Sequence, residues 1–244
     1  MIVKREHEST RIEAFSDAMF AFAATLLVVS LEVPREFSDL VTNLRGFAPF
    51  ALSFAALYFI WVAHTNVFRR YGLGDTYTLI VNGLLLFTVL FYVYPLKFTA
   101  TAIVGMFTHN DVGLTSSQAG SLFTIYGIGW TMVFACIALL YRHANVIRDR
   151  LGLSAVESYD AITHSRHYLA FAMAGVISML LAIFGIGIRY GIPGFAYALT
   201  GIFASINGTR RRKERQHLVE QVAAHPQLAN TGSISTESIR KGLK

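Results

Sequence analysis

Uncharged, largely apolar stretches recur along the chain and predict a series of long helices. Five stretches contain no Asp, Glu, Lys or Arg for 20 residues or more: Gly46–Phe68, Thr76–Leu96, Val112–Tyr141, His167–Ile188 and Tyr190–Thr209. A bilayer core about 30 Å thick requires about 20 apolar residues of helix. A soluble domain accommodates one buried helix of this kind, but not five. The pattern therefore predicts an integral membrane protein.

The first hydrophobic segment is shorter than the others. Only the residues between Asp17 and Glu32 are uncharged, and a run of this length is more typical of a buried or re-entrant helix. We still predict a span from about Ala14 to Val33, because Glu32 can lie at the interface and Pro34 ends the helix. Asp17 then lies just inside the membrane, where a charge is costly unless it faces protein or water. Asp17 therefore marks a candidate functional site.

The predicted architecture is all-α, with six transmembrane helices in one domain. The spans are expected at about Ala14–Val33, Arg45–Arg70, Asp75–Lys97, Ser117–Arg142, His167–Ile188 and Ile192–Thr209. Residues 1–13 form an N-terminal arm, residues 14–209 the six-helix domain, and residues 210–244 a basic tail that reads as disordered.

The basic residues predict the orientation of these helices. With the N-terminus inside, all but four of the 21 Lys and Arg residues fall on the cytoplasmic side, the exceptions being Arg35, Arg45, Lys97 and Arg189. Cytoplasmic loops carry such an excess of positive charge. Both termini are therefore expected in the cytoplasm. The charged N-terminus lacks the features of a cleavable signal peptide, so the first hydrophobic segment is retained and the expected location is the cell membrane.

Composition excludes several other classes of protein. The chain is 54% hydrophobic and only 15% charged, with a mean hydropathy of +0.48, whereas soluble domains are about 25% charged. The single cysteine, Cys136, rules out a disulfide framework within the chain. The net charge of +6 is explained by the cytoplasmic loops and the tail, so we expect a lipid bilayer as partner and no nucleic acid.

Several polar residues are predicted to meet in one layer of the membrane. Ser16 and Asp17 open the first helix, Trp61 and His64 lie toward the cytoplasmic end of the second, and Asn82 toward that of the third. Their donors and acceptors can satisfy one another, and we favour a shared network that includes both Asp17 and His64. The alternative is that each group reaches the nearby interface separately, as we expect for Asn66.

The same residues do not form a convincing enzyme site. Neighbouring helical residues project about 100° apart, which makes a triad of Ser16, Asp17 and His64 awkward. No nucleophile elbow and no His-Glu-x-x-His sequence occurs, and the eight histidines are scattered. We therefore expect no enzymatic activity, no resident metal and no cofactor.

The start of the first helix resembles a known family. The segment Arg11-Ile-Glu-Ala-Phe15-Ser16-Asp17 is similar to the Arg-x-x-x-Phe-Ser-Asp signature of the transmembrane protein 175 family of potassium channels. The Trp61-x-x-His64 pair and the Asn82-Gly-Leu-Leu sequence also resemble that family. The resemblance is good over Arg11–Lys97, and beyond it rests on the six-helix pattern. Like the family, the chain lacks a Thr-Val-Gly-Tyr-Gly filter.

The resemblance implies a pore for K⁺ that is lined by the first helix of each subunit. A single six-helix repeat implies a homotetramer, as in bacterial relatives. Helical spacing places Phe22, Thr25 or Leu26, and Val29 on one face, with Asp17 about 140° from Phe22. The family pattern implies an apolar constriction at Phe22, a hydroxyl ring at Thr25, and further apolar rings at Leu26 and Val29. Phe22 replaces an expected Ile or Leu, so Leu26 is the alternative gate.

Two other functions remain open at this point. A secondary transporter or proton pathway would use Asp17 and His64 as relays, although no inverted repeat or matching pair of broken helices is visible. A scaffolding protein would explain small residues at helical spacing, but not a charged residue in the first span. Passive potassium conduction is the leading prediction.

Overall fold

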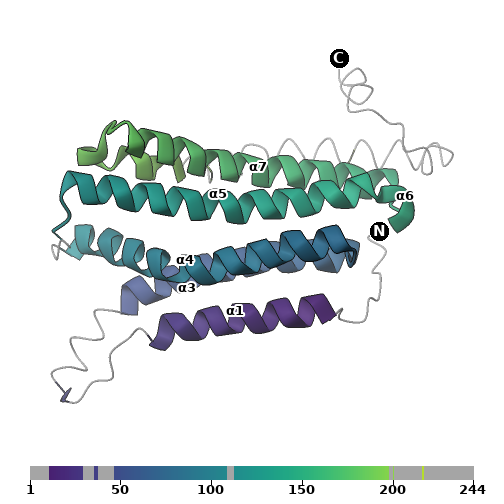
Figure 1. Cartoon of the computed structure of the whole chain (residues 1–244), viewed down its shortest axis with the longest axis horizontal. Coiled ribbons are helices and arrows are strands. Elements are labelled where there is room, and N and C mark those ends of the chain that lie inside the picture. The colour runs from purple at the N-terminus through teal and green to yellow at the C-terminus, as the bar shows by residue number, and fades with distance from the viewer. Residues whose placement is uncertain are drawn as a thin grey trace.

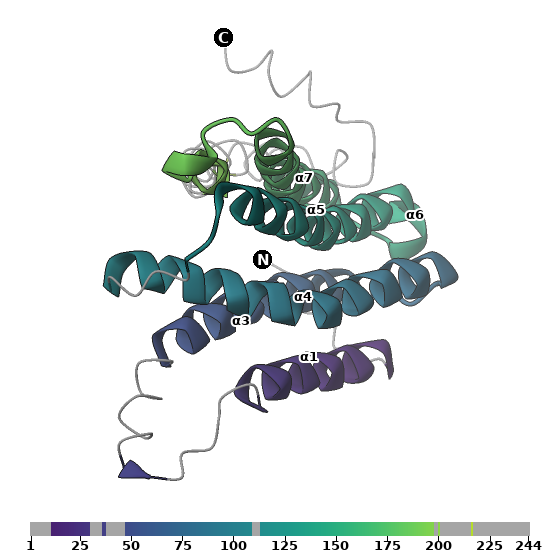
Figure 2. The same ribbon diagram turned by 60° about the vertical axis from the view of Figure 1, so that its left-hand side comes forward.

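The described part of the protein is all-helical, which confirms the predicted fold class at that level. The computed structural model describes residues 11–29, 36–37, 47–108, 113–197, 200 and 216. Its long helices lie side by side in three tiers (Figures 1 and 2). The elements are α1 (Arg11–Val29), α3 (Phe47–Tyr71), α4 (Thr76–Thr108), α5 (Ser116–Val146), α6 (Arg148–Leu151), α7 (Ala155–Ile183) and the 3₁₀ turn η1 (Ile188–Tyr190). In the view of Figure 1, α5 and α7 form the upper tier, α3 and α4 the middle tier, and α1 the lower tier.

Five of the described helices are long and apolar enough to cross a membrane, namely α1, α3, α4, α5 and α7. They correspond to the first five predicted spans. The sixth predicted span, Ile192–Thr209, is helical over residues 192–197, and most of its remainder lies outside the described residues. The end of the first predicted span after Val29, residues 1–10 of the predicted arm and nearly all of the predicted tail also lie outside them.

Two helices extend well beyond the predicted boundaries. The predicted span Asp75–Lys97 is part of α4, which continues through Pro95 to Thr108. The predicted start at His167 is wrong for the helix as a whole, because α7 begins at Ala155 behind a capping box of Ser154 and Glu157. Charged residues limit the part of a helix that lies in lipid, but a well-capped helix continues into water.

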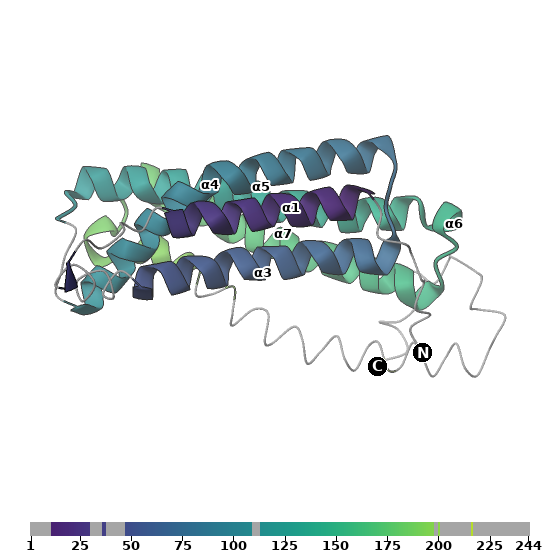
Figure 3. The ribbon, with the colours of Figure 1, turned by 90° about the horizontal axis from the view of Figure 1, so that it is seen from below.

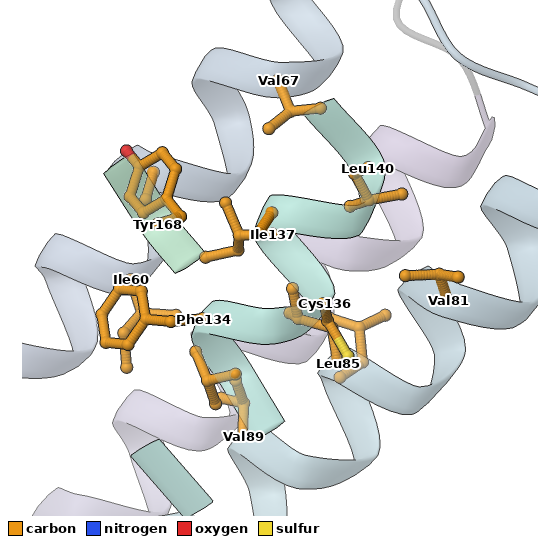
Figure 4. Packing of buried hydrophobic residues seen from close by; sticks show 14 of the residues in the cluster. Ile60, Val67, Val81, Leu85, Val89, Phe134, Cys136, Ile137, Leu140 and Tyr168 are labelled. Carbon is orange, nitrogen blue, oxygen red and sulfur yellow. The ribbon is translucent and has the colours of Figure 1, made fainter. Parts of the chain in front are cut away.

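The helix α5 forms the centre of the bundle. Its buried Phe134, Ile137 and Leu140 are part of one hydrophobic cluster that also takes in side chains of α3, α4 and α7. Figure 4 shows these side chains meeting Leu85 and Val89 from one side. From the other side, they meet Ile60 and Tyr168. The α5 helix thereby joins the upper and middle tiers of the molecule.

The two helices of the upper tier are in very close contact. A Cβ atom at Gly175 of α7 would lie 3.0 Å from the backbone oxygen of Gly127 in α5, and 2.5 Å from the hydroxyl of Thr131. Trp130 Nε1 donates a hydrogen bond of 2.8 Å to the carbonyl oxygen of Phe171. Glycine at these positions lets the two backbones approach each other, as is typical of membrane helices.

Candidate functional site

The α1 helix lies at the edge of the bundle and packs through one face only. It contacts α3 and α4, and Figure 3 shows it running between them. The buried side chains of this face are Ser16, Phe20, Ala23 and Leu27. They are spaced by four, three and four residues, which places them along one side of the helix.

A first polar contact holds α1 to α3. The indole Nε1 of Trp61 donates a hydrogen bond of 2.8 Å to Oδ1 of Asp17. Asp17 itself is exposed, at the flank of the helix rather than in the buried face. The contact therefore joins a carboxylate on α1 to an uncharged donor on α3.

A second polar contact holds α1 to α4. The amide nitrogen of Asn82 donates to Ser16 Oγ at 2.9 Å, and Ser16 Oγ donates to the carbonyl oxygen of Ile12 at 2.8 Å. The amide oxygen of Asn82 can only accept, so His64 Nε2, 2.8 Å away, carries the proton of that bond. Ser16, His64 and Asn82 are all almost completely buried. The hydrogen bonds thus run in one direction, from α3 through α4 into α1.

We refer to Ser16, Asp17, Trp61, His64 and Asn82 together as the polar anchor. The structure brings these five predicted residues together at the interface of α1, α3 and α4. They form two branches, and among the described residues no hydrogen bond joins Asp17 directly to His64. Removing Asp17 would therefore leave Trp61 without its acceptor and would not remove the hydrogen-bond partner of His64. Arg11 and Phe15 lie exposed in the first turn of α1, outside both branches.

His64 also packs between two aromatic rings. Its ring centroid lies 5.5 Å from that of Phe20 and 4.6 Å from that of Phe68. The orientation of the imidazole is fixed, because Phe20, Phe68 and its hydrogen-bond partner Asn82 are all buried. The packing holds the ring in place, and the hydrogen bond to Asn82 selects the tautomer with its proton on Nε2.

The face of α1 opposite the bundle contains most of the predicted pore residues. Phe22 is 53% exposed and Val29 is 72% exposed, and Thr25 is exposed between them. Leu26 differs from these three, because it is partly buried against the hydrophobic core. The predicted stripe of four residues therefore separates into three that face outward and one that packs back on the bundle.

The hydroxyl of Thr25 makes its hydrogen bond within its own helix. Its Oγ1 donates to the carbonyl oxygen of Ala21 at 2.9 Å. A hydroxyl that donates its proton to the backbone keeps its oxygen lone pairs as acceptors. Thr25 therefore presents an acceptor oxygen on the exposed face, which suits a partly dehydrated cation.

Comparison with known proteins identifies the family. Residues 11–95 match the model of the family described as endosomal/lysosomal potassium channel TMEM175. A protein of Marivirga tractuosa named potassium channel is 35% identical over 189 residues, which cover 73% of this chain and 76% of the relative. The chain belongs to the TMEM175 family. A potassium channel of Chamaesiphon minutus is 30% identical over 186 residues, covering 73% of this chain and 89% of that protein.

Solved structures agree with this assignment. The crystal structure of a threonine-to-alanine variant of the potassium channel MtTMEM175, in complex with a nanobody fusion, matches with a TM-score of 0.76 and 32% identity. The match covers 87% of this chain and 97% of that one. The TMEM175 homologue of Chamaesiphon minutus shares the fold, with a TM-score of 0.52 and 24% identity over 79% of this chain. The resemblance predicted from the signature at Arg11–Asp17 is thereby confirmed.

Proposed function

We propose that the chain is a potassium channel whose pore is lined by α1 from each of four copies. The observation that carries this proposal is the exposed face of α1. It presents a hydroxyl at Thr25 and, at its flank, the carboxylate of Asp17, in a helix otherwise suited to the membrane. A carboxylate is costly in lipid, so this side of α1 needs protein or water against it. The relatives, which have the names of potassium channels rather than of enzymes, support the same function.

Within this pore, we assign the constriction to Phe22. Four phenyl rings on the outward face would narrow the axis and exclude water, since apolar constrictions gate by dewetting. Leu26 is turned toward the bundle, which favours Phe22 over Leu26 as the narrowest ring. Thr25 would form a ring of acceptor oxygens beside it, and Val29 a second apolar ring. We propose K⁺ as the permeant ion and no cofactor.

The polar anchor would hold α1 in the correct rotation about its own axis. One branch binds α1 through Ser16 on its buried face, and the other binds it through Asp17 at the flank. Neither branch covers the face that contains Phe22 and Thr25. Arg11 and Phe15 would lie at the cytoplasmic entrance. The arrangement separates holding the helix from conducting the ion.

The complete topology that we propose has six spans with both termini in the cytoplasm of a bacterial cell. Four copies would place their α1 helices around one axis in the cell membrane. Native mass spectrometry of the purified protein tests the number of copies, and a dimer or monomer would contradict the shared pore.

Flux through reconstituted vesicles tests the function itself. We expect passive flux down a potassium gradient, with slower flux when sodium replaces potassium. Saturating uptake that requires a proton gradient would instead favour a transporter that uses Asp17 and His64. Absence of flux for all three ions, in protein shown to be folded, would favour a scaffold.

A further inference from the structure

The turn between α3 and α4 packs against residues of α5, α6 and α7. Leu73 lies in this short turn and yet is completely buried, as is Tyr71 just before it. The same hydrophobic cluster includes partly buried Ile147, Leu151 and Leu153, which connect α5, α6 and α7. The turn that joins the two helices of the polar anchor is therefore packed against the end of the α5–α7 pair.

A contact between a carboxylate and a histidine at this junction connects the α3–α4 turn to α5. Oδ2 of Asp75, the last residue of the turn, lies 2.6 Å from Nε2 of His143 in α5. The other oxygen of Asp75 accepts from the backbone nitrogen of Thr78 at 3.1 Å and from the Thr78 hydroxyl, which caps the start of α4. The ring of Tyr77 lies against the imidazole, with centroids 4.3 Å apart. The side chains of His143 and Asp75 are only 13% and 20% exposed.

The pair is connected to α1 by a short route. Asp75 fixes the first turn of α4, and Asn82 lies about two helical turns further along the same helix. Asn82 in turn donates to Ser16 of α1. A displacement of the start of α4 relative to α5 therefore acts directly on the contact that holds α1. Such a contiguous chain of rigid helix and hydrogen bonds is able to carry coupling between sites.

We propose that Asp75 and His143 form a proton-responsive latch between the α5–α7 half and the helix that lines the pore. Histidine changes its charge between pH 5 and 8. Neutral His143 offers Asp75 a hydrogen bond, and protonated His143 adds an opposite charge and a cation against the ring of Tyr77. Protons on this side of the membrane, the cytoplasmic side in the proposed topology, therefore tighten the latch. The effect on current rests on the proposed channel function, whereas the latch itself does not.

The carboxylate of Asp75 is the constant partner of the pair, because it remains charged across this range of pH. Burial raises the pKa of Asp75, but hydrogen bonds from Thr78 and His143 outweigh it and hold that pKa below its ordinary value. Among the described residues, Thr78 and His143 are the neighbours that lower this pKa.

Other ionisable groups at this end of the bundle surround different side chains. Arg69 and Arg70 end α3 and are exposed, as is Arg142 beside His143. Arg70 and Asp160 act on the buried tyrosines of this region rather than on Asp75. His164 of α7 stacks on Tyr141 with a centroid distance of 5.1 Å. His164 is therefore the matched control, a second histidine at the same end that is not part of the pair.

The experiment compares the full-length protein with three variants at pH 8 and pH 6. His143→Gln keeps an N–H donor without a titrating charge, Asp75→Asn keeps a cap for Thr78 without the negative charge, and His164→Gln is the control. We expect acidification to shift the unfolding equilibrium of the wild type and of His164→Gln toward the folded state, by about fivefold more than that of the other two variants. Equal pH dependence in wild type and His143→Gln, or its loss in His164→Gln alone, would overturn the latch.

Potassium flux measured at the same two pH values tests the coupling to the pore. We expect a change in flux with pH in the wild type that is at least halved in both His143→Gln and Asp75→Asn. A pH-dependent stability with identical flux profiles would show that the latch does not reach α1, and would contradict the coupling. Absence of wild-type flux at every pH would instead contradict the proposed channel function, while the unfolding measurement still decides the latch.

Discussion

The α5–α7 pair and the α1 helix are held in the molecule by different means. The pair meets through two glycines whose backbones approach closely, and Trp130 and Thr131 add hydrogen bonds to backbone carbonyls of α7. The α1 helix contains no glycine, and is joined to α3 and α4 by the polar anchor and one buried stripe. In α1 the polar contacts lie near its N-terminal end, whereas the buried stripe extends along the helix.

This difference separates a scaffold from a helix that requires further partners. In a membrane, close packing of small residues gives a large and continuous interface, whereas a single hydrogen bond between helices contributes on average about 0.6 kcal/mol. The interface between α5 and α7 is therefore completed within one chain. The α1 helix leaves Phe22, Thr25 and Val29 uncovered, and its position is sensitive to a few named atoms.

The largest effect is expected from closing the gap between α5 and α7. In Gly175→Ala the new methyl group would lie 2.5 Å from the Thr131 hydroxyl and 2.9 Å from Trp130 Cδ1, so the helices must separate. We expect a loss of about 2–3 kcal/mol of stability, measured by thermal unfolding in detergent. Gly83→Ala in α4 is the control, because nothing lies within 4 Å of its new methyl group. Equal stability of the two variants would remove the distinction between scaffold and peripheral helix.

A smaller loss is expected from cutting the second branch of the polar anchor. Asn82→Leu removes the acceptor of His64 Nε2 and the donor to Ser16, leaving a buried polar group unpaired. We expect about 1–2 kcal/mol of destabilisation, together with faster proteolysis at α1, followed by mass spectrometry of the fragments. Thr88→Val is the control, since the Thr88 hydroxyl bonds only to Leu84 of its own helix. Loosening of α5–α7 ahead of α1 would contradict the comparison.

The exposed face of α1 is tested by removing its largest side chain. Phe22→Ala is expected to raise potassium flux about fivefold, because it widens the proposed constriction and lowers the barrier by about 1 kcal/mol. The measurement is potassium flux from vesicles at equal protein content. Phe184→Ala makes the same change at an exposed position beyond the end of α7 and should leave the flux unchanged. Unchanged flux in Phe22→Ala would place the narrowest ring elsewhere.

The sequence predicted the five described spans more accurately than the ends of their helices. Runs without charge mark what lies in lipid, and they located all five described spans. They do not mark where a helix ends, because α7 begins in a capping box at Ser154 and α4 continues through Pro95. The family was identified from the signature at Arg11–Asp17. This signature lies entirely within one short segment of one helix, so it does not depend on where the helices end.

The partners within the site were predicted only in part. Asp17 and His64 were expected in one network because their depths match, but pairing depends on rotation about the helix axis, which depth does not fix. The separation of Leu26 from Thr25 has the same origin, since neighbours differ by about 100° and only the packing decides between them. The Asp75–His143 pair was not predicted, because it joins residues far apart in the sequence at helix ends whose positions were uncertain.

The smallest expected effect concerns selectivity at Thr25. Thr25→Val keeps the shape of the side chain and removes the oxygen that faces outward, while its loss of the bond to Ala21 affects only an exposed carbonyl. We expect the ratio of potassium to sodium flux to fall about two- to threefold, because a ring of hydroxyls replaces part of the hydration shell of the ion. Thr25→Ser restores the oxygen and should restore the ratio. If both variants retained the wild-type ratio, Thr25 would have no role in selection, and the exposed face of α1 would be a surface for assembly rather than for the ion.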